Sequence, residues 1–262
     1  MNSKLMKAPV KFAIYLPPGY ETDNRSYPVL YLLHGYTDDE TGWIQFGEAP
    51  RIADEEISNG DAPPMIIVMP DGGVTWYMND YQEKTPWADM FIKEFIPYIE
   101  SNYRIRVKRE FRAIAGLSMG GFGALHLAMR NTGLFATCVA MSAGIYTDEE
   151  ITAMRDDSYE NVFGFLIGTG LKDKVRLNDT WKKFNPLHIL DEIPKEDINK
   201  VRWYIDCGDD DFLYKGNSAL HVKMRDLGIN HEYRVRNGKH EWAYWRSSLR
   251  TGLGFIGQGF HR

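Results

Sequence analysis

The chain has 262 residues, and its hydrophobic content of 44% with 13% aromatic residues suffices for a sizeable core. Its 31 basic against 36 acidic residues give a formal net charge of −5, which leaves no electrostatic case for nucleic-acid binding. No stretch approaches the ~18 apolar residues of a membrane helix, so a membrane-spanning protein is not predicted either.

The start of the chain leaves the cellular compartment open. Residues 1–9 lack the apolar stretch of a signal peptide, whereas 10–16 already has the pattern of a first strand. Such a start suits a mature domain trimmed of its leader, which would favour a secreted or periplasmic location. It suits a cytosolic protein as well. Cys138 and Cys207 lie in apolar strand-like runs and are predicted to be buried thiols, which fixes no redox compartment.

Strand-like segments recur along the chain and, in its later part, alternate with helical patterns. The predicted strands lie at about 11–15, 29–34, 65–70, 111–116, 137–142, 201–207 and 232–236, and the predicted helices near 49–58, 87–102, 119–131, 217–227 and 241–256. This alternation favours an α/β fold with a mainly parallel, doubly wound sheet. Only turn residues separate the first two strands, which favours an antiparallel start. No repeat or interdomain linker is visible, so one domain over 1–262 is predicted.

One region breaks this alternation. The stretch 145–185, which precedes the apolar segment 185–190, is longer than a simple crossover needs. Thr147 and Glu150 have the spacing of a capping box, which predicts the start of a helix. The stretch is compatible with a lid over a functional site and equally with a packed helical excursion.

The sequence Gly116-Leu117-Ser118-Met119-Gly120 is a GxSxG motif between an apolar run at 111–115 and a small-residue helix at 121–130. Strand, sharp turn and helix are the context of a nucleophile elbow, which lifts a serine hydroxyl clear of the backbone. Bulky side chains at Gly116 or Gly120 would collide in such a turn. The motif therefore predicts a nucleophilic Ser118 rather than an ordinary serine in a glycine-rich turn.

A nucleophilic serine needs a histidine base, and in folds of this kind the base follows the serine and the acid along the chain. His240 meets this order, because it lies in a loop after the strand at 232–236 and just before a helix. His34 precedes Ser118, and His126 shares a helix face with apolar residues. The other histidines lie in or beside predicted elements or at the terminus: His188, His221, His231 and His261. His240 is the predicted base.

The acid that orients His240 should come from the loop after the strand at 201–207. Three carboxylates follow that strand, and a fourth lies within it: Asp209, Asp210, Asp211 and Asp206. Position alone does not choose among them, and Glu241, beside the histidine, is a weak rival.

An acyl-transfer site also needs two backbone N–H donors for the oxyanion. The first should be Met119, which follows the nucleophile at the positive end of its helix. The second should be Tyr36, in the loop after the strand at 29–34, where Gly35 lets the backbone approach the site. His34 is expected to organise this loop rather than to exchange protons.

With these residues assembled, five segments spread along the chain carry a family resemblance. They are 15–20 (YLPPGY), 27–35 (YPVLYLLHG), 66–73 (IIVMPDGG), 114–121 (IAGLSMGG) and 207–211 (CGDDD). The sequence resembles the esterase D-like family of α/β-hydrolases, which includes feruloyl and acetylxylan esterases of carbohydrate esterase family 1, S-formylglutathione hydrolases and mycolyltransferases. The 145–185 stretch does not match the leaner members.

The resemblance implies an α/β-hydrolase fold with Ser118 and His240 in catalysis and the N–H groups of Met119 and Tyr36 in the oxyanion hole. The family's acid stands last in a Cys-Gly-x-x-Asp pattern, which selects Asp211. The implied activity is that of a serine carboxylester hydrolase that removes feruloyl or acetyl groups from plant cell-wall polysaccharide such as xylan. The alternatives are an acyltransferase, a small-acyl esterase like S-formylglutathione hydrolase, and a non-catalytic carbohydrate-binding relative.

Aromatic residues in loops are the candidates for substrate binding, because their rings stack on sugars or on a cinnamoyl ring. The candidates are Trp43, Trp76, Tyr77, Trp181 and Trp242, each of which could instead pack in the core. The chemistry requires no metal or organic cofactor. The expected partner is a small-molecule or oligosaccharide ester, and the oligomeric state stays open.

Overall fold

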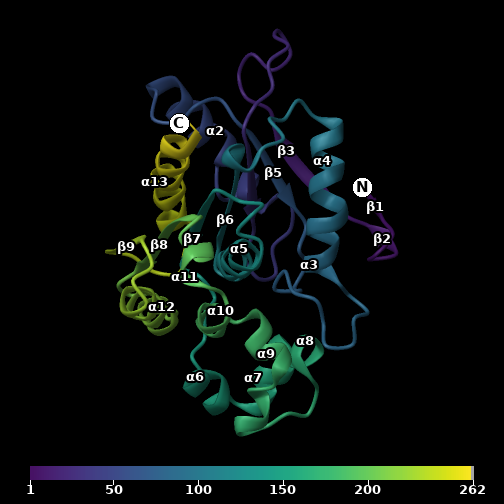
Figure 1. The fold of residues 1–262 in the computed structure, drawn as a ribbon, viewed down its shortest axis with the longest axis vertical. Helices are drawn as coiled ribbons and strands as arrows, with labels where there is room; N and C mark the ends of the chain where they lie inside the picture. The colour runs from purple at the N-terminus through teal and green to yellow at the C-terminus, as the bar shows by residue number, and fades with distance from the viewer. Residues whose placement is uncertain (261–262) are drawn as a thin grey trace.

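A computed structural model describes residues 1–260 and contains a seven-stranded sheet in the order β3-β5-β4-β6-β7-β8-β9 (Figure 1). The strands are β3 (Phe12–Tyr15), β4 (Val29–Leu33), β5 (Ile66–Pro70), β6 (Arg112–Leu117), β7 (Thr137–Met141), β8 (Arg202–Gly208) and β9 (His231–Arg236). All neighbours pair in parallel except β3, which is antiparallel to β5. The predicted doubly wound, mainly parallel α/β fold is confirmed.

The antiparallel first strand is also present, but its partner is not the strand that follows it in sequence. β4 lies between β5 and β6 and is paired on both edges, so it has no free edge for β3. β3 therefore crosses to the outer edge of β5, where Tyr15 faces Ile67. A short antiparallel pair that the sequence did not predict, β1 (Asn2–Ser3) and β2 (Ala8–Pro9), precedes it.

Helices cover both faces of the sheet, and each face has its own core. One core holds α2 (Ala49–Asn59) and α13 (Trp242–Phe260) against the sheet. The other holds α3 (Trp87–Met90), the π-helical turn η1 (Phe91–Phe95), α4 (Ile96–Asn102), α5 (Met119–Arg130) and α12 (Tyr214–Asp226). In β4, side chains alternate between the two cores, which is why this buried strand is apolar throughout. Two short elements, α1 (Gly42–Gln45) and the 3₁₀ turn η2 (Arg109–Phe111), lie in connections.

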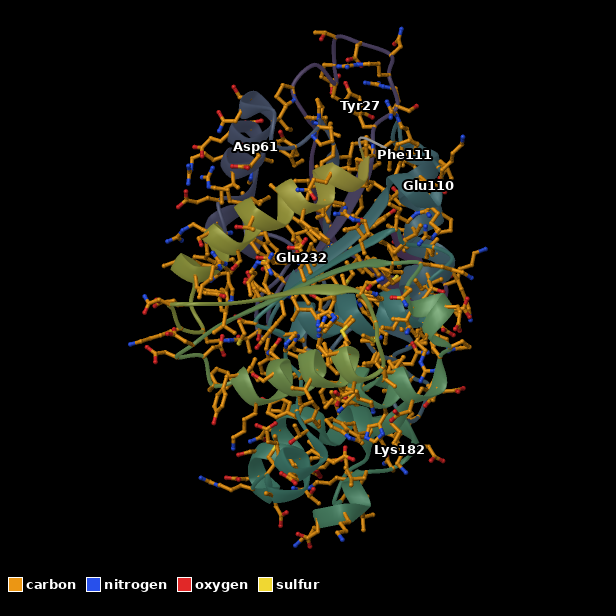
Figure 2. The ribbon with its side chains drawn as sticks, turned by 60° about the vertical axis from the view of Figure 1, so that its left-hand side comes forward. Tyr27, Asp61, Glu110, Phe111, Lys182 and Glu232 are labelled. Atoms are coloured by element: carbon orange, nitrogen blue, oxygen red, sulfur yellow. The ribbon has the colours of Figure 1, made fainter. Side chains whose placement is uncertain are left out.

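The stretch 145–185 forms a group of short helices at one end of the molecule (Figure 1). They are α6 (Asp148–Ala153), α7 (Asp156–Tyr159), the π-helical turn η3 (Glu160–Gly164), α8 (Phe165–Ile167), the 3₁₀ turn η4 (Asp173–Arg176) and α9 (Asp179–Phe184), followed by α10 (Pro186–Glu192) and α11 (Lys195–Ile198). Figure 2 shows Lys182 of α9 at the opposite end from Tyr27. We refer to 145–185 as the insertion.

Polar contacts fix the start and the centre of the insertion. The predicted capping box is confirmed, because Thr147 Oγ1 accepts from the Glu150 N–H and the Glu150 carboxylate accepts from the Thr147 N–H. Arg176 is 1% exposed and donates to the carbonyl of Ile151 and to the carboxylate of Asp156. The apolar side chains of the insertion join the core that covers α5, so it packs on the main fold.

Three remaining expectations concern burial and the end of the chain. Cys138 and Cys207 are buried free thiols, as predicted. Within residues 1–260, none of the helices has the length and apolar character that crossing a membrane requires. His261 lies outside the described residues.

Candidate active site

Ser118 occupies the sharp turn between β6 and α5, with a backbone φ of 54°. A Cβ added at Gly116 would lie 2.3 Å from the carbonyl oxygen of Gly120, and one added at Gly120 would lie 2.4 Å from the carbonyl oxygen of Leu33. Only glycine fits these two positions, so the motif folds into a strained elbow that exposes the serine hydroxyl. The Ser118 N–H donates to the Met141 carbonyl at 2.9 Å, which anchors the turn on β7.

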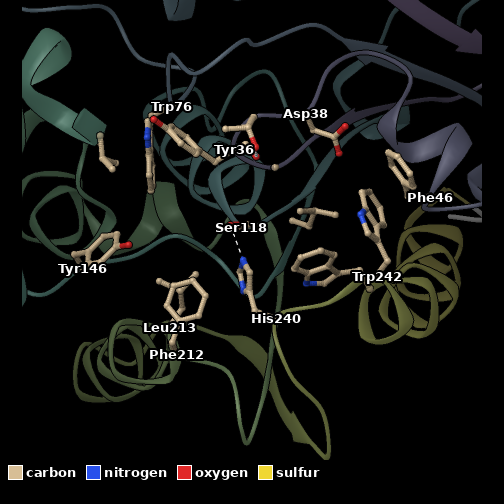
Figure 3. A pocket seen from close by; sticks show the side chains of 15 residues that line it. Tyr36, Asp38, Phe46, Trp76, Ser118, Tyr146, Phe212, Leu213, His240 and Trp242 are labelled. Atoms are coloured by element: carbon tan, nitrogen blue, oxygen red, sulfur yellow. Dashed lines mark hydrogen bonds between the residues drawn. The ribbon is translucent and has the colours of Figure 1, made fainter. Parts of the chain in front are cut away.

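His240 lies between Ser118 and Asp211, and Figure 3 shows its contact with Ser118. Its Nε2 lies 2.9 Å from Ser118 Oγ, and its Nδ1 lies 2.9 Å from Asp211 Oδ2 and 3.1 Å from Oδ1. Because an ionised carboxylate only accepts, Nδ1 carries the proton, which leaves Nε2 able to accept from the serine hydroxyl. We call Ser118, His240 and Asp211 the hydrogen-bonded trio.

The three aspartates in the loop after β8 have different partners. Asp211 is 1% exposed and faces His240, whereas Asp209 accepts from the Gly238 N–H at 2.9 Å and so ties this loop to the one that carries His240. Asp210 is exposed, and its N–H donates to the Gly238 carbonyl at 3.1 Å. Asp211 is thus the carboxylate that the fold brings to the histidine.

Burial alone would raise the pKa of Asp211, but hydrogen bonds from His240 and from the Leu213 N–H outweigh it. The pKa of Asp211 is therefore held below its usual value, and the carboxylate stays ionised beside the imidazole.

Asp206 lies within β8 and takes no part in the trio. It is fully buried, and its Oδ2 accepts from Arg236 Nη2 at 2.8 Å, whereas Oδ1 has no partner among the described residues. Burial raises the pKa of Asp206 to about 6, against the opposing effect of Arg236.

The two predicted oxyanion donors lie beside Ser118. Met119 is the first residue of α5, so its N–H has no partner within the helix, and Tyr36 lines the same cavity as Ser118. His34 holds the Tyr36 loop, because its Nδ1 lies 2.8 Å from the Gly35 carbonyl oxygen and its Nε2 accepts from the Gly72 N–H at 2.8 Å. The expected organising role of His34 agrees with these contacts.

A cavity of about 510 Å³ opens over Ser118. In Figure 3, Trp76 and Tyr146 lie on one side of Ser118, and Asp38, Phe46 and Trp242 lie on the other. We call Trp76, Tyr146 and Val162 the aromatic side of the cavity, and Asp38, Phe46 and Trp242 the carboxylate side. The lining is completed by Gly35, Tyr36, Thr37, Leu117, Phe212, Leu213, His240 and Trp245.

Of the five aromatic residues expected to bind substrate, only Trp76 and Trp242 line this cavity. The expectation is wrong for Trp43, Tyr77 and Trp181, which are 0%, 0% and 3% exposed. Each is turned inward with its polar atom bonded to the protein: Trp43 Nε1 to the Leu33 carbonyl, Tyr77 Oη to the His34 carbonyl and Trp181 Nε1 to Asp148. Tyr77 thereby supports the loop that carries Tyr36.

Sequence reasoning missed most of the cavity lining. Asp38 follows the Tyr36 loop directly and Phe212 follows Asp211 directly, so proximity to predicted site residues could have found them. Tyr146 and Val162 lie in the insertion, for which a lid over the site is one of two interpretations, but no pattern singles out these two residues. Within residues 1–260, no group of three His, Cys, Asp or Glu side chains has an arrangement that could hold a metal ion.

The esterase family model matches residues 3–256 of this chain. An esterase of Mycobacterium tuberculosis is 30% identical over 245 residues, which cover 87% of this chain and 51% of that protein. An acetyl esterase of Caldicellulosiruptor saccharolyticus is 29% identical over 237 residues, which cover 87% of this chain and 83% of that protein. An endo-1,4-beta-xylanase/feruloyl esterase of Xylanibacter ruminicola is 35% identical over 171 residues, covering 61% and 22%. The chain thus spans about half the length of the mycobacterial relative.

Solved structures with the same fold include a ferulic acid esterase, with a TM-score of 0.84 and 32% identity over 99% of this chain and 96% of that one. An S-formylglutathione hydrolase from Staphylococcus aureus superposes with a TM-score of 0.77 over 98% and 96% of the two chains. Its identity of 22% makes it a likeness of fold alone.

Proposed function

Because the chain belongs to the esterase family, whose model spans residues 3–256, we propose that it is a serine esterase that hydrolyses carboxylic esters through an acyl-enzyme. The observation that carries the proposal is the continuous hydrogen-bonded path from Ser118 Oγ through His240 to Asp211, with contacts of 2.9 Å on both sides of the imidazole. This arrangement can remove the serine proton at the moment the hydroxyl attacks.

In the first half of the reaction, His240 Nε2 takes the proton of Ser118 as Oγ attacks the ester carbonyl carbon. The carbonyl oxygen becomes negatively charged, and the N–H groups of Met119 and Tyr36 stabilise it. The tetrahedral intermediate then collapses. The bond from carbon to the alcohol oxygen breaks, His240 gives its proton to the departing alcohol, and the acyl group stays on Ser118.

In the second half, a water molecule takes the place of the alcohol. His240 removes a proton from the water as its oxygen attacks the acyl carbon, and the proton then passes to Ser118 Oγ as the acid departs. Asp211 keeps the imidazole oriented and stabilises its positive charge in both halves. Its ionised state supports this role.

We propose that the substrates are feruloyl or acetyl esters of plant cell-wall polysaccharide such as xylan. The relatives named acetyl esterase and endo-1,4-beta-xylanase/feruloyl esterase support this class of substrate, as does the ferulic acid esterase that is 32% identical over nearly the whole chain. The aromatic side of the cavity offers the apolar, ring-shaped surface that a cinnamoyl group needs.

We further propose that the insertion belongs to the same domain and acts as a lid-like wall of the site. Val162 of the insertion lines the cavity, and Phe163 packs on Trp76 with 4.8 Å between ring centroids. Tyr36 Oη donates to the Asn161 carbonyl at 3.3 Å, so the insertion touches the loop that carries an oxyanion donor. These contacts favour a wall that is packed in place.

The test is the initial rate of hydrolysis of methyl ferulate and of p-nitrophenyl acetate by the wild type and by Ser118→Ala. We expect the wild type to hydrolyse methyl ferulate, and the variant to lose about 10⁴–10⁶ in kcat, since it lacks the attacking atom. A variant that kept half of its activity would exclude Ser118 as the nucleophile.

Product analysis completes this test. Turnover of the acetyl ester alone would narrow the function to a small-acyl or acetylxylan-type esterase. Transfer of the acyl group to an added sugar in preference to water would instead identify an acyltransferase.

A further inference from the structure

The carboxylate side of the cavity contains a charge that the proposed reaction does not use. Asp38 lines the cavity with Phe46 and Trp242, on the opposite side of Ser118 from Trp76 and Tyr146 (Figure 3). Acyl transfer by Ser118 and His240 needs no second carboxylate there, so the position of Asp38 calls for another explanation.

The carboxylate of Asp38 is poorly satisfied by the protein. Within residues 1–260 it accepts a hydrogen bond only from the Asp39 N–H, at 3.2 Å, and no lysine or arginine pairs with it. Burial raises the pKa of Asp38, which reflects the poor solvation of its charge. A partly buried carboxylate with free lone pairs needs hydrogen-bond donors from outside the protein.

The Asp38 carboxylate packs against Gly42, the first residue of α1. A Cβ added at Gly42 would lie 2.2 Å from Asp38 Oδ2, so the carboxylate occupies the space that a side chain at position 42 would fill. The adjacent Asp39 carboxylate instead accepts from the N–H and from the hydroxyl of Thr41, both at 2.7 Å. The two neighbouring carboxylates therefore differ. That of Asp39 is hydrogen-bonded within the turn, whereas Asp38 lines the cavity and accepts only from the Asp39 N–H within residues 1–260.

Two aromatic rings accompany Asp38. Phe46 is 50% exposed, and its ring centroid lies 5.9 Å from that of Trp242. Trp242 is fixed from behind by edge contacts with Trp43 at 5.4 Å and Trp245 at 5.3 Å. The result is a firm apolar surface beside an unpaired hydrogen-bond acceptor.

A neutral sugar matches this combination, because its hydroxyl groups donate to a carboxylate while its C–H faces pack on aromatic rings. The aromatic side lacks a charged acceptor and suits the acyl group. Building on the proposed function, we propose that Asp38, together with Phe46 and Trp242, binds the sugar that forms the alcohol part of the ester. Asp38 is thereby a specificity-determining residue for esters of neutral sugars over esters of simple alcohols.

The test compares two substrates that share an acyl group and differ in the alcohol: feruloyl arabinose and methyl ferulate. We expect Asp38→Ala to lower kcat/KM for feruloyl arabinose about tenfold, through KM, because a charge-assisted hydrogen bond to the sugar is lost. For methyl ferulate, which has no sugar, we expect a change of less than about twofold. Asp38→Asn, which keeps one acceptor oxygen, should recover part of the loss.

Asp39→Ala is the matched control, since it removes the same charge from the same loop but outside the cavity. Any disturbance of the loop should affect both substrates equally in this variant. An equal loss on both substrates in Asp38→Ala, or no loss on either, would overturn the role of Asp38 while leaving the esterase intact. A wild type that hydrolysed neither ferulate ester would overturn the proposed substrate class and the sugar site with it.

Discussion

The hydrogen-bonded trio and the walls of the cavity face the same space but are held in different ways. Ser118, Asp211 and His240 follow β6, β8 and β9, and His240 contacts each of the other two residues at 2.9 Å. Tyr146 and Val162 come from the insertion and are held by packing, as in the 5.6 Å contact between the rings of Tyr146 and Phe163. Directional bonds fix reacting atoms closely, whereas packed rings fix only a shape.

This difference leads to two kinds of mutational effect. Changes in the trio should lower kcat for every ester, because each ester passes through the same transition state. Changes in the walls should act on KM, and only for esters whose acyl or alcohol part is large enough to reach the changed side chain. The predictions below are arranged to separate these two outcomes, beginning with the largest effect.

After Ser118→Ala, the next largest effect is expected for Asp211→Asn, which should lower kcat by about 10³–10⁴ for acetyl and feruloyl esters alike. An amide in place of the carboxylate no longer fixes the His240 tautomer that accepts the serine proton. Steady-state kinetics on p-nitrophenyl acetate and methyl ferulate would measure it. Asp210→Asn is the matched control, because its side chain is exposed in the same loop and should change kcat by less than about twofold. If Asp210→Asn gave the larger loss, Asp211 would not be the acid.

The elbow at Ser118 and the cavity walls also differ in how well they can be predicted from the sequence. The elbow at Ser118 requires glycine at 116 and 120, so its signature is local and can be read from the chain. The cavity walls depend on which way each ring turns. Trp43 and Trp242 are in edge contact at 5.4 Å, yet only Trp242 lines the cavity. Trp43 is turned away from the cavity, with its Nε1 donating to the Leu33 carbonyl. No sequence pattern reveals such a tertiary contact.

Among the four carboxylates, Asp206 shows another limit of the sequence. Asp206 lies within β8 and Asp211 lies in the loop that follows it, and both are buried. The pKa of Asp206 lies above its usual value, whereas that of Asp211 lies below it. The partners decide this difference, because Asp211 accepts from His240 and Leu213 while one oxygen of Asp206 has no partner within residues 1–260.

The raised pKa of Asp206 predicts a pH dependence of stability. Its pKa is about 6 in the folded protein and 3.8 without burial, so between these values the folded state holds a proton that the unfolded state has lost. The contribution of Asp206 to the free energy of unfolding therefore grows as pH falls from 6 toward 4, by about 2–3 kcal/mol. Denaturant unfolding of the wild type and Asp206→Asn at pH 4.5 and 8 would measure it.

Asp206→Asn carries no titrating group at this position, so the difference between the two proteins should change with pH. Carboxylates with lowered pKa values, such as Asp211, lose stabilising interactions at lower pH, but they do so equally in both proteins and cancel. A difference that stayed constant from pH 8 to 4.5 would contradict the raised pKa.

A smaller effect is expected for Tyr146→Ala on the aromatic side of the cavity. Loss of this ring should raise KM for methyl ferulate about tenfold, because the cinnamoyl group loses a packing surface, and leave kcat for p-nitrophenyl acetate nearly unchanged. Phe165→Ala is the control, since Phe165 lies in the insertion, is 39% exposed and does not line the cavity. An equal loss on both esters in Tyr146→Ala would mean that the insertion supports the trio as well as the wall.

The smallest effect is expected at Tyr36, where the two regions meet in one residue. Its backbone N–H is the proposed second oxyanion donor, and its hydroxyl donates to the Asn161 carbonyl of the insertion at 3.3 Å. Tyr36→Phe removes only the second contact, and a long hydrogen bond at an exposed position contributes little, so we expect about a twofold rise in KM for methyl ferulate. The rate on p-nitrophenyl acetate should hold, because the N–H stays in place. A fall in kcat on both esters would show that the insertion helps to position the oxyanion donor, and the wall would then be part of the catalytic machinery.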